Sequence, residues 1–268
     1  MSDDLVALIN FLKRRGKTGI CVAFSGGVDS AVVLKAAVMS GVRVHAVTFK
    51  TVLHPEKEIK GTVKLAKQIK APHTILEINE FDNKKITDNT IDRCYHCKYM
   101  LFQELKKFAR MNKLGRVMDG TNVDDLLDYR PGLKALQELK IVSPLADLSI
   151  DKDTVREIAR EMNLPVSDKP SAPCLATRIP YNVPINPDSL TKIALGEEYL
   201  KRQGFKVVRI RLHGDVARIE IPKNGLSKFL SQKDQIINQL KKLGFVYVAL
   251  DLEGFRSGSM DAVIEKRG

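Results

Sequence analysis

The residues whose types and spacing most clearly indicate chemistry are Ser25-Gly26-Gly27-Val28-Asp29-Ser30. A short apolar run at 20–24 precedes them, and an apolar run rich in small residues follows at 31–38. A glycine-rich turn between a strand and a helix leaves backbone N–H groups unpaired at the positive helix end, where anions bind. The glycines let the backbone approach a phosphate closely, and the serine hydroxyls add donors. The spacing and the lysine of a Walker A loop are both missing.

Four cysteines are the second chemical feature. Cys94-Tyr95-His96-Cys97 has the C-x-x-C spacing that lets two thiolates reach one metal or cluster, although a redox pair, half a zinc site or a coincidence would also explain it. His96 is a candidate fourth ligand if three cysteines bind zinc. Cys174 lies in a proline-rich segment. Three thiolates without an obvious fourth fit an open site, such as a [4Fe–4S] cluster with one iron free of protein, better than a closed structural zinc site. Cys21 lies inside an apolar run, so we expect a small core residue.

The sequence pattern predicts that these residues are positioned by an α/β domain with a doubly wound parallel sheet. Short apolar runs alternate with helical patterns. The predicted strands are 19–24, 43–49, 73–78, 116–119 and a fifth near 141–143, and the predicted helices are 29–40, 56–70, 95–112 and 151–162. Ligands of such sheets bind at the carboxyl ends of the strands, which here carry Ser25, Thr48 and Gly120.

The rest of the chain predicts a second, smaller α+β domain. Prolines crowd the stretch 165–187, which is typical of a linker or loop. Beyond it the pattern predicts a helix at 188–203, strands at 206–212 and 216–221, a helix at about 224–243 and a strand at 245–251. We therefore expect a nucleotide-binding domain at 1–165, a linker at 166–187 that carries Cys174, and a substrate-binding or oligomerisation domain at 188–268.

Composition narrows the class of protein. The chain has 268 residues, 44% of them hydrophobic, and a net charge of +12. No apolar run approaches the roughly 18 residues of a membrane span, and the acidic, amphipathic start is unlike a signal peptide, so we expect a cytoplasmic protein without membrane contact. The charge predicts an anionic partner: a nucleotide, a phosphorylated small molecule or RNA. Aromatic residues make up 6% and tryptophan is missing, so the sequence does not favour nucleic acid.

The hexapeptide in its strand–turn–helix setting resembles the pyrophosphatase loop of the ATP pyrophosphatase (PP-loop) superfamily, which has the adenine nucleotide alpha hydrolase-like fold. Residues 120–125 resemble the GTN-x-D-D segment of many members, although a plain loop with a helix cap would look similar. The resemblance implies cleavage of ATP between the α and β phosphates, adenylation of a substrate oxygen and release of pyrophosphate. The ATP-binding residues it implies are Ala23, Ser25, Gly26, Gly27, Asp29, Ser30, Thr48 and Gly120, with Asp29 and Ser30 also catalytic. Asp29 would have a Mg²⁺-linked or loop-orienting role; the alternative is a carboxylate that complements the helix dipole.

Three further segments, 174–178, 209–214 and 250–259, are similar to those of the LarE-type sulfur transferases, which help make the nickel-pincer nucleotide cofactor. This likeness covers essentially the whole chain. It implies that a carboxylate of pyridinium-3,5-dicarboxylate mononucleotide is adenylated and converted to a thiocarboxylate. Some members sacrifice the sulfur of one cysteine, at the position of Cys174; others have three cysteines and hold a [4Fe–4S] cluster. The second pattern implies that Cys94, Cys97 and a catalytic Cys174 are the cluster ligands, with sulfide from an outside source.

Arginine side chains are the candidates for anchoring such a substrate, because guanidinium forks suit phosphate and carboxylate. The candidates are Arg130, Arg178, Arg209 and Arg211. Arg209 and Arg211 would share one strand face, with an ion pair to Glu220 as the structural alternative. Glu197 and Glu220 match acidic positions of the family near a metal or the substrate. A further acid expected soon after Glu220 is missing from 223–228, which argues against an acidic metal site.

Two other functions are compatible with the sequence. A sulfur transferase acting on tRNA would suit the charge of +12, but the chain has no paired C-x-x-C modules near its ends. A nucleotide-binding redox or metal sensor would use the same cysteines without catalysis. We expect the LarE-type enzyme, with ATP, Mg²⁺ and a [4Fe–4S] cluster as cofactors, a small nucleotide substrate, and a homo-oligomeric state by family analogy.

Overall fold

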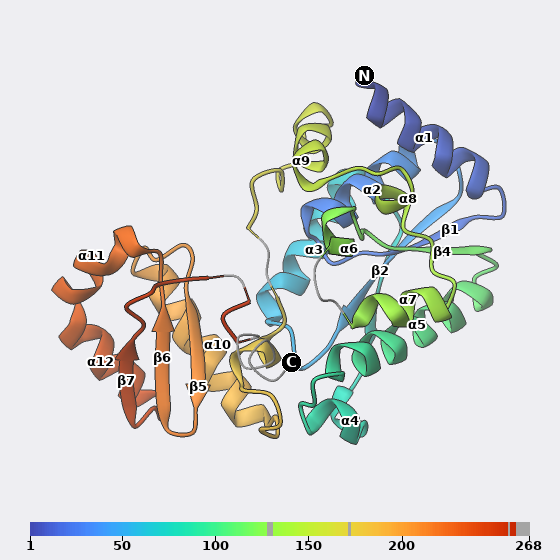
Figure 1. The fold of residues 1–268 in the computed structure, drawn as a ribbon. Helices are drawn as coiled ribbons and strands as arrows, with labels where there is room; N and C mark the ends of the chain where they lie inside the picture. Colours follow the sequence, from blue (N-terminus) through green and yellow to red (C-terminus); the bar gives the residue numbers. More distant parts are fainter. Residues whose placement is uncertain (128–130, 171–172, 257, 261–268) are drawn as a thin grey trace. The chain divides into compact units, whose positions relative to one another are not determined.

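A computed structural model describes residues 1–127, 131–170, 173–256 and 258–260 (Figure 1). The chain forms two compact units. The first comprises Met1–Asp82 and Asp92–Ala172, and the second comprises Asn83–Ile91 and Pro173–Gly268. Among the described residues, no helix combines the length and the apolar character that a membrane crossing requires.

The first unit is built on a parallel sheet of four strands in the order β3-β2-β1-β4. The strands are β1 (Ile20–Ala23), β2 (Val44–Lys50), β3 (His73–Glu77) and β4 (Arg116–Met118). The four parallel strands confirm the predicted fold class. The predicted fifth strand near 141–143 was wrong for the described residues, since Val142 forms only an isolated bridge with Met118. The chain turns there into a helix that begins at Pro144, and proline has no N–H to continue a strand.

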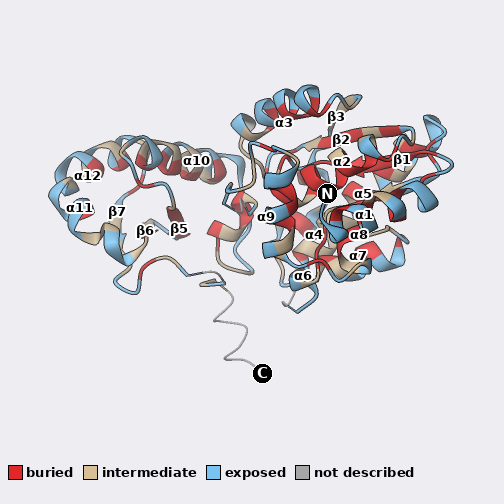
Figure 2. Cartoon of the chain, turned by 90° about the horizontal axis from the view of Figure 1, so that it is seen from above, coloured by how far each residue is buried: buried red, intermediate tan, exposed pale blue. Residues whose placement is uncertain are grey.

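Helices cover both faces of this sheet, as a doubly wound fold requires. They are α1 (Asp3–Arg15), α2 (Val28–Met39), α3 (Glu56–Ile69), α5 (Arg93–Met111), α6 (Asp124–Leu127), α7 (Gly132–Glu138), α8 (Pro144–Asp147) and α9 (Lys152–Glu161), with a 3₁₀ turn η1 (Glu80–Asp82). One hydrophobic core joins β1 and β2 to α1, α2, α3, α8 and α9. A second core joins Cys21 and Val47, on the other face, to α5 and α7. Helix α2 is apolar nearly all round because it lies between the sheet and other helices (Figure 2).

The second unit is a small α+β structure. Its elements are α4 (Lys84–Thr87), η2 (Leu175–Arg178), α10 (Pro187–Arg202), β5 (Arg209–His213), β6 (Val216–Glu220), η3 (Lys223–Gly225), α11 (Leu226–Ser231), α12 (Lys233–Lys242) and β7 (Tyr247–Leu250). Strands β5 and β6 are antiparallel and β6 and β7 are parallel. The turn between β5 and β6 contains Gly214 at φ 58°, a conformation that glycine adopts readily. The predicted helix at 224–243 is two helices, which meet at Gln232.

The boundary between the units differs from the predicted one. Residues 83–91, expected in the first domain, belong to the second unit because they are hydrogen-bonded to residues 179–185. The Asn89 side chain donates to the carbonyl oxygen of Pro180 (2.8 Å), and Asn182 N donates to the carbonyl oxygen of Asn89 (2.9 Å). Much of the expected linker is likewise packed, since Leu175, Ala176, Ile179 and Ile185 are buried.

Candidate active site

The glycine-rich turn (residues 24–30) follows β1 at the carboxyl end of the sheet. Phe24 N still donates to the carbonyl oxygen of Val47 (2.8 Å), and the chain then leaves the sheet at Ser25. Gly26 has φ 71°, and a Cβ atom there would lie 2.8 Å from Thr62 Cγ2, so both conformation and space require glycine. Gly27 caps α2 without a side-chain hydrogen bond. The first N–H groups of α2 are therefore placed to receive a ligand anion.

The two serine hydroxyls of the turn lie side by side. Ser25 Oγ is 3.1 Å from Ser30 Oγ and accepts a hydrogen bond from Gly27 N (3.3 Å). Ser30 Oγ also donates to the carbonyl oxygen of Gly27 (3.2 Å). The predicted residues Ser25, Gly27 and Ser30 thus form one cluster of donors at the start of α2.

The ends of β2 and β4 meet the same turn. Thr48 Oγ1 donates to the carbonyl oxygen of Phe24 (2.6 Å) and lies 2.8 Å from His73 Nε2. After β4, a Cβ atom on Gly120 would lie 2.7 Å from Ser30 N, so only glycine lets this segment pass against α2. The structure therefore brings the ATP-binding residues expected from three strand ends into one place.

Asp29 connects the turn to two distant segments. Asn122 Nδ2 donates to Asp29 Oδ1 (2.9 Å), and Lys152 Nζ lies 2.5 Å from Asp29 Oδ2. Asn122 belongs to the segment that resembles GTN-x-D-D. These contacts orient the carboxylate at the first turn of α2.

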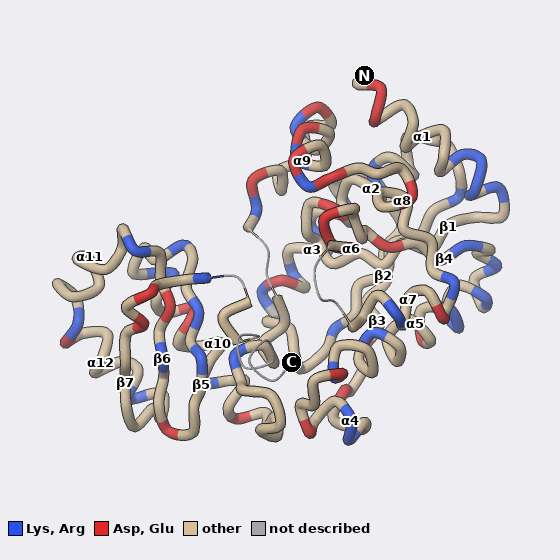
Figure 3. Tube along the Cα trace, viewed as in Figure 1, with Lys and Arg blue, Asp and Glu red and all other residues tan. Residues whose placement is uncertain are grey.

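Two lysines at the turn were missed by the sequence analysis. Lys152, the first residue of α9, binds Asp29, and Lys169 Nζ donates to the carbonyl oxygen of Gly26 (3.2 Å). An isolated lysine far along the chain carries no spacing signal that relates it to residues 25–30. Figure 3 shows that most lysines and arginines lie elsewhere on the first unit, many of them around the starts of β1 and β4.

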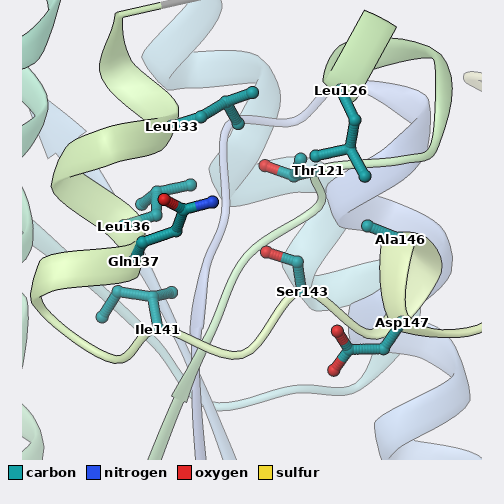
Figure 4. A pocket seen from close by; sticks show the side chains of 9 residues that line it. All are labelled: Thr121, Leu126, Leu133, Leu136, Gln137, Ile141, Ser143, Ala146 and Asp147. Atoms are coloured by element: carbon teal, nitrogen blue, oxygen red, sulfur yellow. The ribbon is translucent and has the colours of Figure 1, made fainter.

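A hollow of about 240 Å³ lies beside the end of β4, among α6, α7 and α8 (Figure 4). Thr121 and Ser143 present hydroxyls to it, while Leu126, Leu133 and Ile141 make its wall partly apolar. The same hydroxyls donate to the buried Asp119 carboxylate, at 2.5 and 2.7 Å. This network fixes the β4 end next to Gly120.

The C-x-x-C pair lies in the first turn of α5. Cys94 and Cys97 are three residues apart on a helix, so they share one face, and both side chains are half-buried. An Arg93 guanidinium nitrogen lies 3.4 Å from Cys94 Sγ. His96 Nε2 lies 2.9 Å from Asp92 Oδ2, so one of the two ring nitrogens of His96 already has a partner. Among the residues that the structure describes, no three His, Cys, Asp or Glu side chains are gathered as a metal site.

The other two cysteines differ in environment. Cys21 is fully buried in β1, and burial raises the pKa of its thiol to about 12, as expected of a core residue. Cys174, in the second unit, is half-buried and precedes η2. Its carbonyl oxygen accepts hydrogen bonds from Thr177 Oγ1 (2.8 Å) and Arg178 Nη1 (3.1 Å). The backbone at Cys174 is therefore fixed to its own unit.

The arginine cluster (Arg178, Arg209, Arg211, Glu197 and Glu220) is buried in the second unit. Arg178 pairs with Glu197 through two bonds, Nε to Oε1 (2.8 Å) and Nη2 to Oε2 (3.1 Å). Glu197 Oε1 also accepts from Ile210 N (3.1 Å). Helix α10, strand β5 and the segment at Cys174 are thereby linked through one carboxylate.

Glu220 is the second carboxylate of the arginine cluster. Arg211 Nη2 lies 2.8 Å and Arg218 Nη2 lies 3.2 Å from its oxygens, and Ser259 Oγ donates to it at 2.6 Å. The ion pair considered as the structural alternative for Arg211 is therefore present. Arg211 Nη1 also donates to the carbonyl oxygen of Thr177 (3.0 Å).

Arg209 lies across from Glu220 in the register of β5 and β6. Its guanidinium carbon is 5.4 Å from the centre of the Phe255 ring. Burial, and then the charge of Arg178, lower the pKa of Arg209. An anion bound beside these arginines would relieve their mutual repulsion. Arg130, the remaining arginine predicted to bind substrate, lies outside the described residues.

A parallel sheet with a glycine-rich anion-binding turn after its first strand defines the class of ATP pyrophosphatase (PP-loop) proteins. Residues 19–100 match the family described as Queuosine biosynthesis protein QueC. The fold is also that of the NMN synthetase from Francisella tularensis, with a TM-score of 0.51 and 18% identity over 63% of this chain and 74% of that one.

Two relatives match nearly the whole chain. The pyridinium-3,5-bisthiocarboxylic acid mononucleotide synthase of Lactiplantibacillus plantarum is 37% identical over 98% of this chain and 94% of its own length. An uncharacterised protein of Synechocystis is 38% identical over 91% of this chain and 92% of its own. The chain therefore belongs to the LarE family of ATP-using, sulfur-transferring enzymes.

Proposed function

We propose that the enzyme adenylates a carboxylate of pyridinium-3,5-dicarboxylate mononucleotide and replaces the activated oxygen with sulfur. The observation that carries this proposal is the 37% identity over 98% of the chain to the synthase of the bisthiocarboxylic acid mononucleotide. The glycine-rich turn and the arginine cluster supply the two anion-binding features that ATP and a mononucleotide need.

The proposed chemistry has two steps. A carboxylate oxygen of the substrate attacks the α-phosphorus of ATP, and the bond to pyrophosphate breaks. A sulfide then attacks the acyl carbon, the bond to AMP breaks, and a proton from HS⁻ goes to solvent. Carboxylates are poor electrophiles, and the acyl-adenylate gives the attacked carbon a good leaving group. Binding both reactants in one site replaces an encounter in solution with a step between positioned groups.

The arginine cluster is the proposed substrate-binding site. Three guanidinium groups face two carboxylates, Glu197 and Glu220, so the cluster keeps an excess of positive charge for the phosphate and carboxylates of the substrate. The glutamates also orient the arginines: Arg178 is held by both oxygens of Glu197. In this proposal Glu197 and Glu220 contribute to substrate binding indirectly, because they hold the arginine side chains in place.

Cys94, Cys97 and Cys174 are the proposed ligands of a [4Fe–4S] cluster. Support comes from the shared helix face of Cys94 and Cys97 and from the guanidinium of Arg93 next to Cys94, which suits an anionic cluster. Three protein thiolates leave one iron open, and that iron would hold the sulfide to be transferred. Mg²⁺ is proposed as the partner of the ATP phosphates.

A single anaerobic turnover followed by intact-protein mass tests the proposal. Protein reconstituted with iron and sulfide is mixed with ATP, sulfide and the dicarboxylate nucleotide. We expect pyrophosphate, AMP and thiocarboxylate to form over several turnovers with unchanged protein mass. Loss of the mass of one H₂S from Cys174 would instead show that this residue is the sulfur donor.

Matched cysteine variants sharpen the result. Cys94→Ala, Cys97→Ala and Cys174→Ala should each lose the broad iron–sulfur absorbance and the thiocarboxylate product. Cys21→Ala should keep both, because Cys21 is a buried residue of the first unit's core. A colourless protein with one tight zinc ion would contradict the cluster, and tight, salt-dependent binding of tRNA would favour the RNA substrate instead.

The proposal also covers the cellular location and the oligomeric state of the enzyme. We expect a homo-oligomer, by analogy with the family, that works in the cytoplasm. Light scattering of the purified protein gives the assembly state directly.

A further inference from the structure

The glycine-rich turn has no positively charged side chains of its own with which to bind phosphates. Residues 20–34 contain no lysine or arginine, and their one charged residue, Asp29, is an anion. A helix N-terminus contributes only about half an elementary charge. A triphosphate at this turn therefore needs positive charge from elsewhere in the fold.

Two lysines from a distant part of the chain meet this need. Lys152 Nζ is 2.5 Å from Asp29 Oδ2, and Lys169 Nζ is 3.2 Å from the carbonyl oxygen of Gly26. Helix α9, which begins with Lys152, is fixed against the core through Val155, Ile158 and Ala159. Packing of α9 therefore brings Lys152 to the turn, and the chain that leads on to Lys169 is held against the same core by Leu164 and Val166.

We infer that Lys152 and Lys169 together replace the lysine of a Walker A loop, with separate tasks. Lys169 binds the phosphates of ATP: its ammonium has three donors, and the Gly26 carbonyl takes one of them. Lys152 is a positioning residue that neutralises Asp29 and holds it away from the phosphates. The inference rests on the use of ATP by this enzyme and not on the proposed substrate or cluster.

ATP and pyrophosphate binding, measured by calorimetry on the full chain with Mg²⁺ and without sulfur substrate, tests Lys169. A hydrogen bond between charged groups contributes about 1.5–3 kcal/mol, so Lys169→Gln should weaken both ligands by about 10- to 100-fold. Lys169→Arg should recover part of the affinity. Lys13→Met, at an exposed lysine in the last turn of α1, is the control and should bind normally.

A double variant tests the separate task of Lys152. Lys152→Met should weaken ATP binding and change its dependence on Mg²⁺, because Asp29 loses this cationic partner and keeps the hydrogen bond from Asn122. Adding Asp29→Asn should restore most of the affinity if Lys152 acts through Asp29. No restoration would show that Lys152 binds phosphate itself and would overturn its assignment as a positioning residue.

Folding is checked for every variant by circular dichroism and by thermal unfolding without ligand. Folded Lys169→Gln and Lys169→Arg proteins that bind ATP within twofold of the parent would overturn the role of Lys169. If only Lys169→Gln misfolds, normal Tm and weaker ATP binding in Lys169→Arg still support that role. Because no sulfur chemistry is measured, failure of the proposed function would leave these results unchanged.

Discussion

The glycine-rich turn and the arginine cluster both offer donors to anions, but they hold those donors by different means. The turn uses backbone N–H groups and two hydroxyls that come from six consecutive residues. The arginine cluster uses full charges from η2, α10, β5 and β6, each already paired with a glutamate or with neighbouring backbone. The backbone shape of the turn depends on its own glycines, whereas the buried charges of the arginine cluster depend on partners from distant segments.

The largest effect is expected from breaking the charge balance of the arginine cluster. Glu220 is 0% exposed and touches Arg211, Arg218 and Ser259. Glu220→Gln leaves both arginines without this carboxylate, so the free energy of unfolding should fall by about 3–5 kcal/mol. Urea unfolding measures the change.

The matched control for that variant is an exposed ion pair. Glu104 and Lys107 lie 2.6 Å apart with side chains 41% and 59% exposed. Glu104→Gln should change the free energy of unfolding by less than about 1 kcal/mol. Equal losses in the two variants would show that burial does not decide the strength of these pairs.

A smaller effect is expected where the glycine-rich turn meets β4. Gly120→Ala puts a Cβ atom 2.7 Å from Ser30 N, and backbone cannot move aside as a flexible side chain can. We expect a loss of about 1–3 kcal/mol in stability and a raised KM for ATP. Steady-state release of pyrophosphate measures the KM.

Gly61 provides the control for Gly120. It lies in α3 and has no atom within 4 Å of an added Cβ. Gly61→Ala should stabilise the protein by about 0.5–1 kcal/mol, because alanine favours a helix more than glycine. An unchanged KM in Gly120→Ala would contradict the close approach that the structure shows.

The smallest effect concerns pH. Burial lowers the pKa of His54 and, together with the charge of His45, that of His73, both in the first unit. The unfolded chain then binds protons more readily, so stability is present above the ordinary histidine pKa of 6.5 and is lost as pH falls below it. His54→Gln should reduce the loss of stability between pH 7.5 and 5.5.

His213 extends the same comparison to the second unit. Burial and then the charge of Arg218 lower its pKa as well. His213→Gln should also flatten the pH dependence, and urea unfolding at the two pH values measures both variants. A parent protein that is more stable at pH 5.5 than at pH 7.5 would contradict the expected loss of stability in acid.

Much of the fold could be predicted because its signals are local. The strands β1 to β4 are short apolar runs between helical patterns, and each was expected within a few residues of its position. The two exceptions have different causes. Val142 pairs only once because the chain turns at Pro144, which is a local signal. Residues 83–91 join the second unit through Asn89, and that contact leaves no pattern in the sequence.

The sequence by itself determined the glycine-rich turn, the arginine and cysteine candidates and the family, because these depend on residue types at fixed spacings. Only the tertiary structure decided that Lys152 and Lys169 reach the turn and that Arg211 pairs with Glu220. The physical reason is the range of the interactions: glycine conformation and helix ends act between neighbours along the chain, whereas a charge finds its partner only after packing has brought distant segments together.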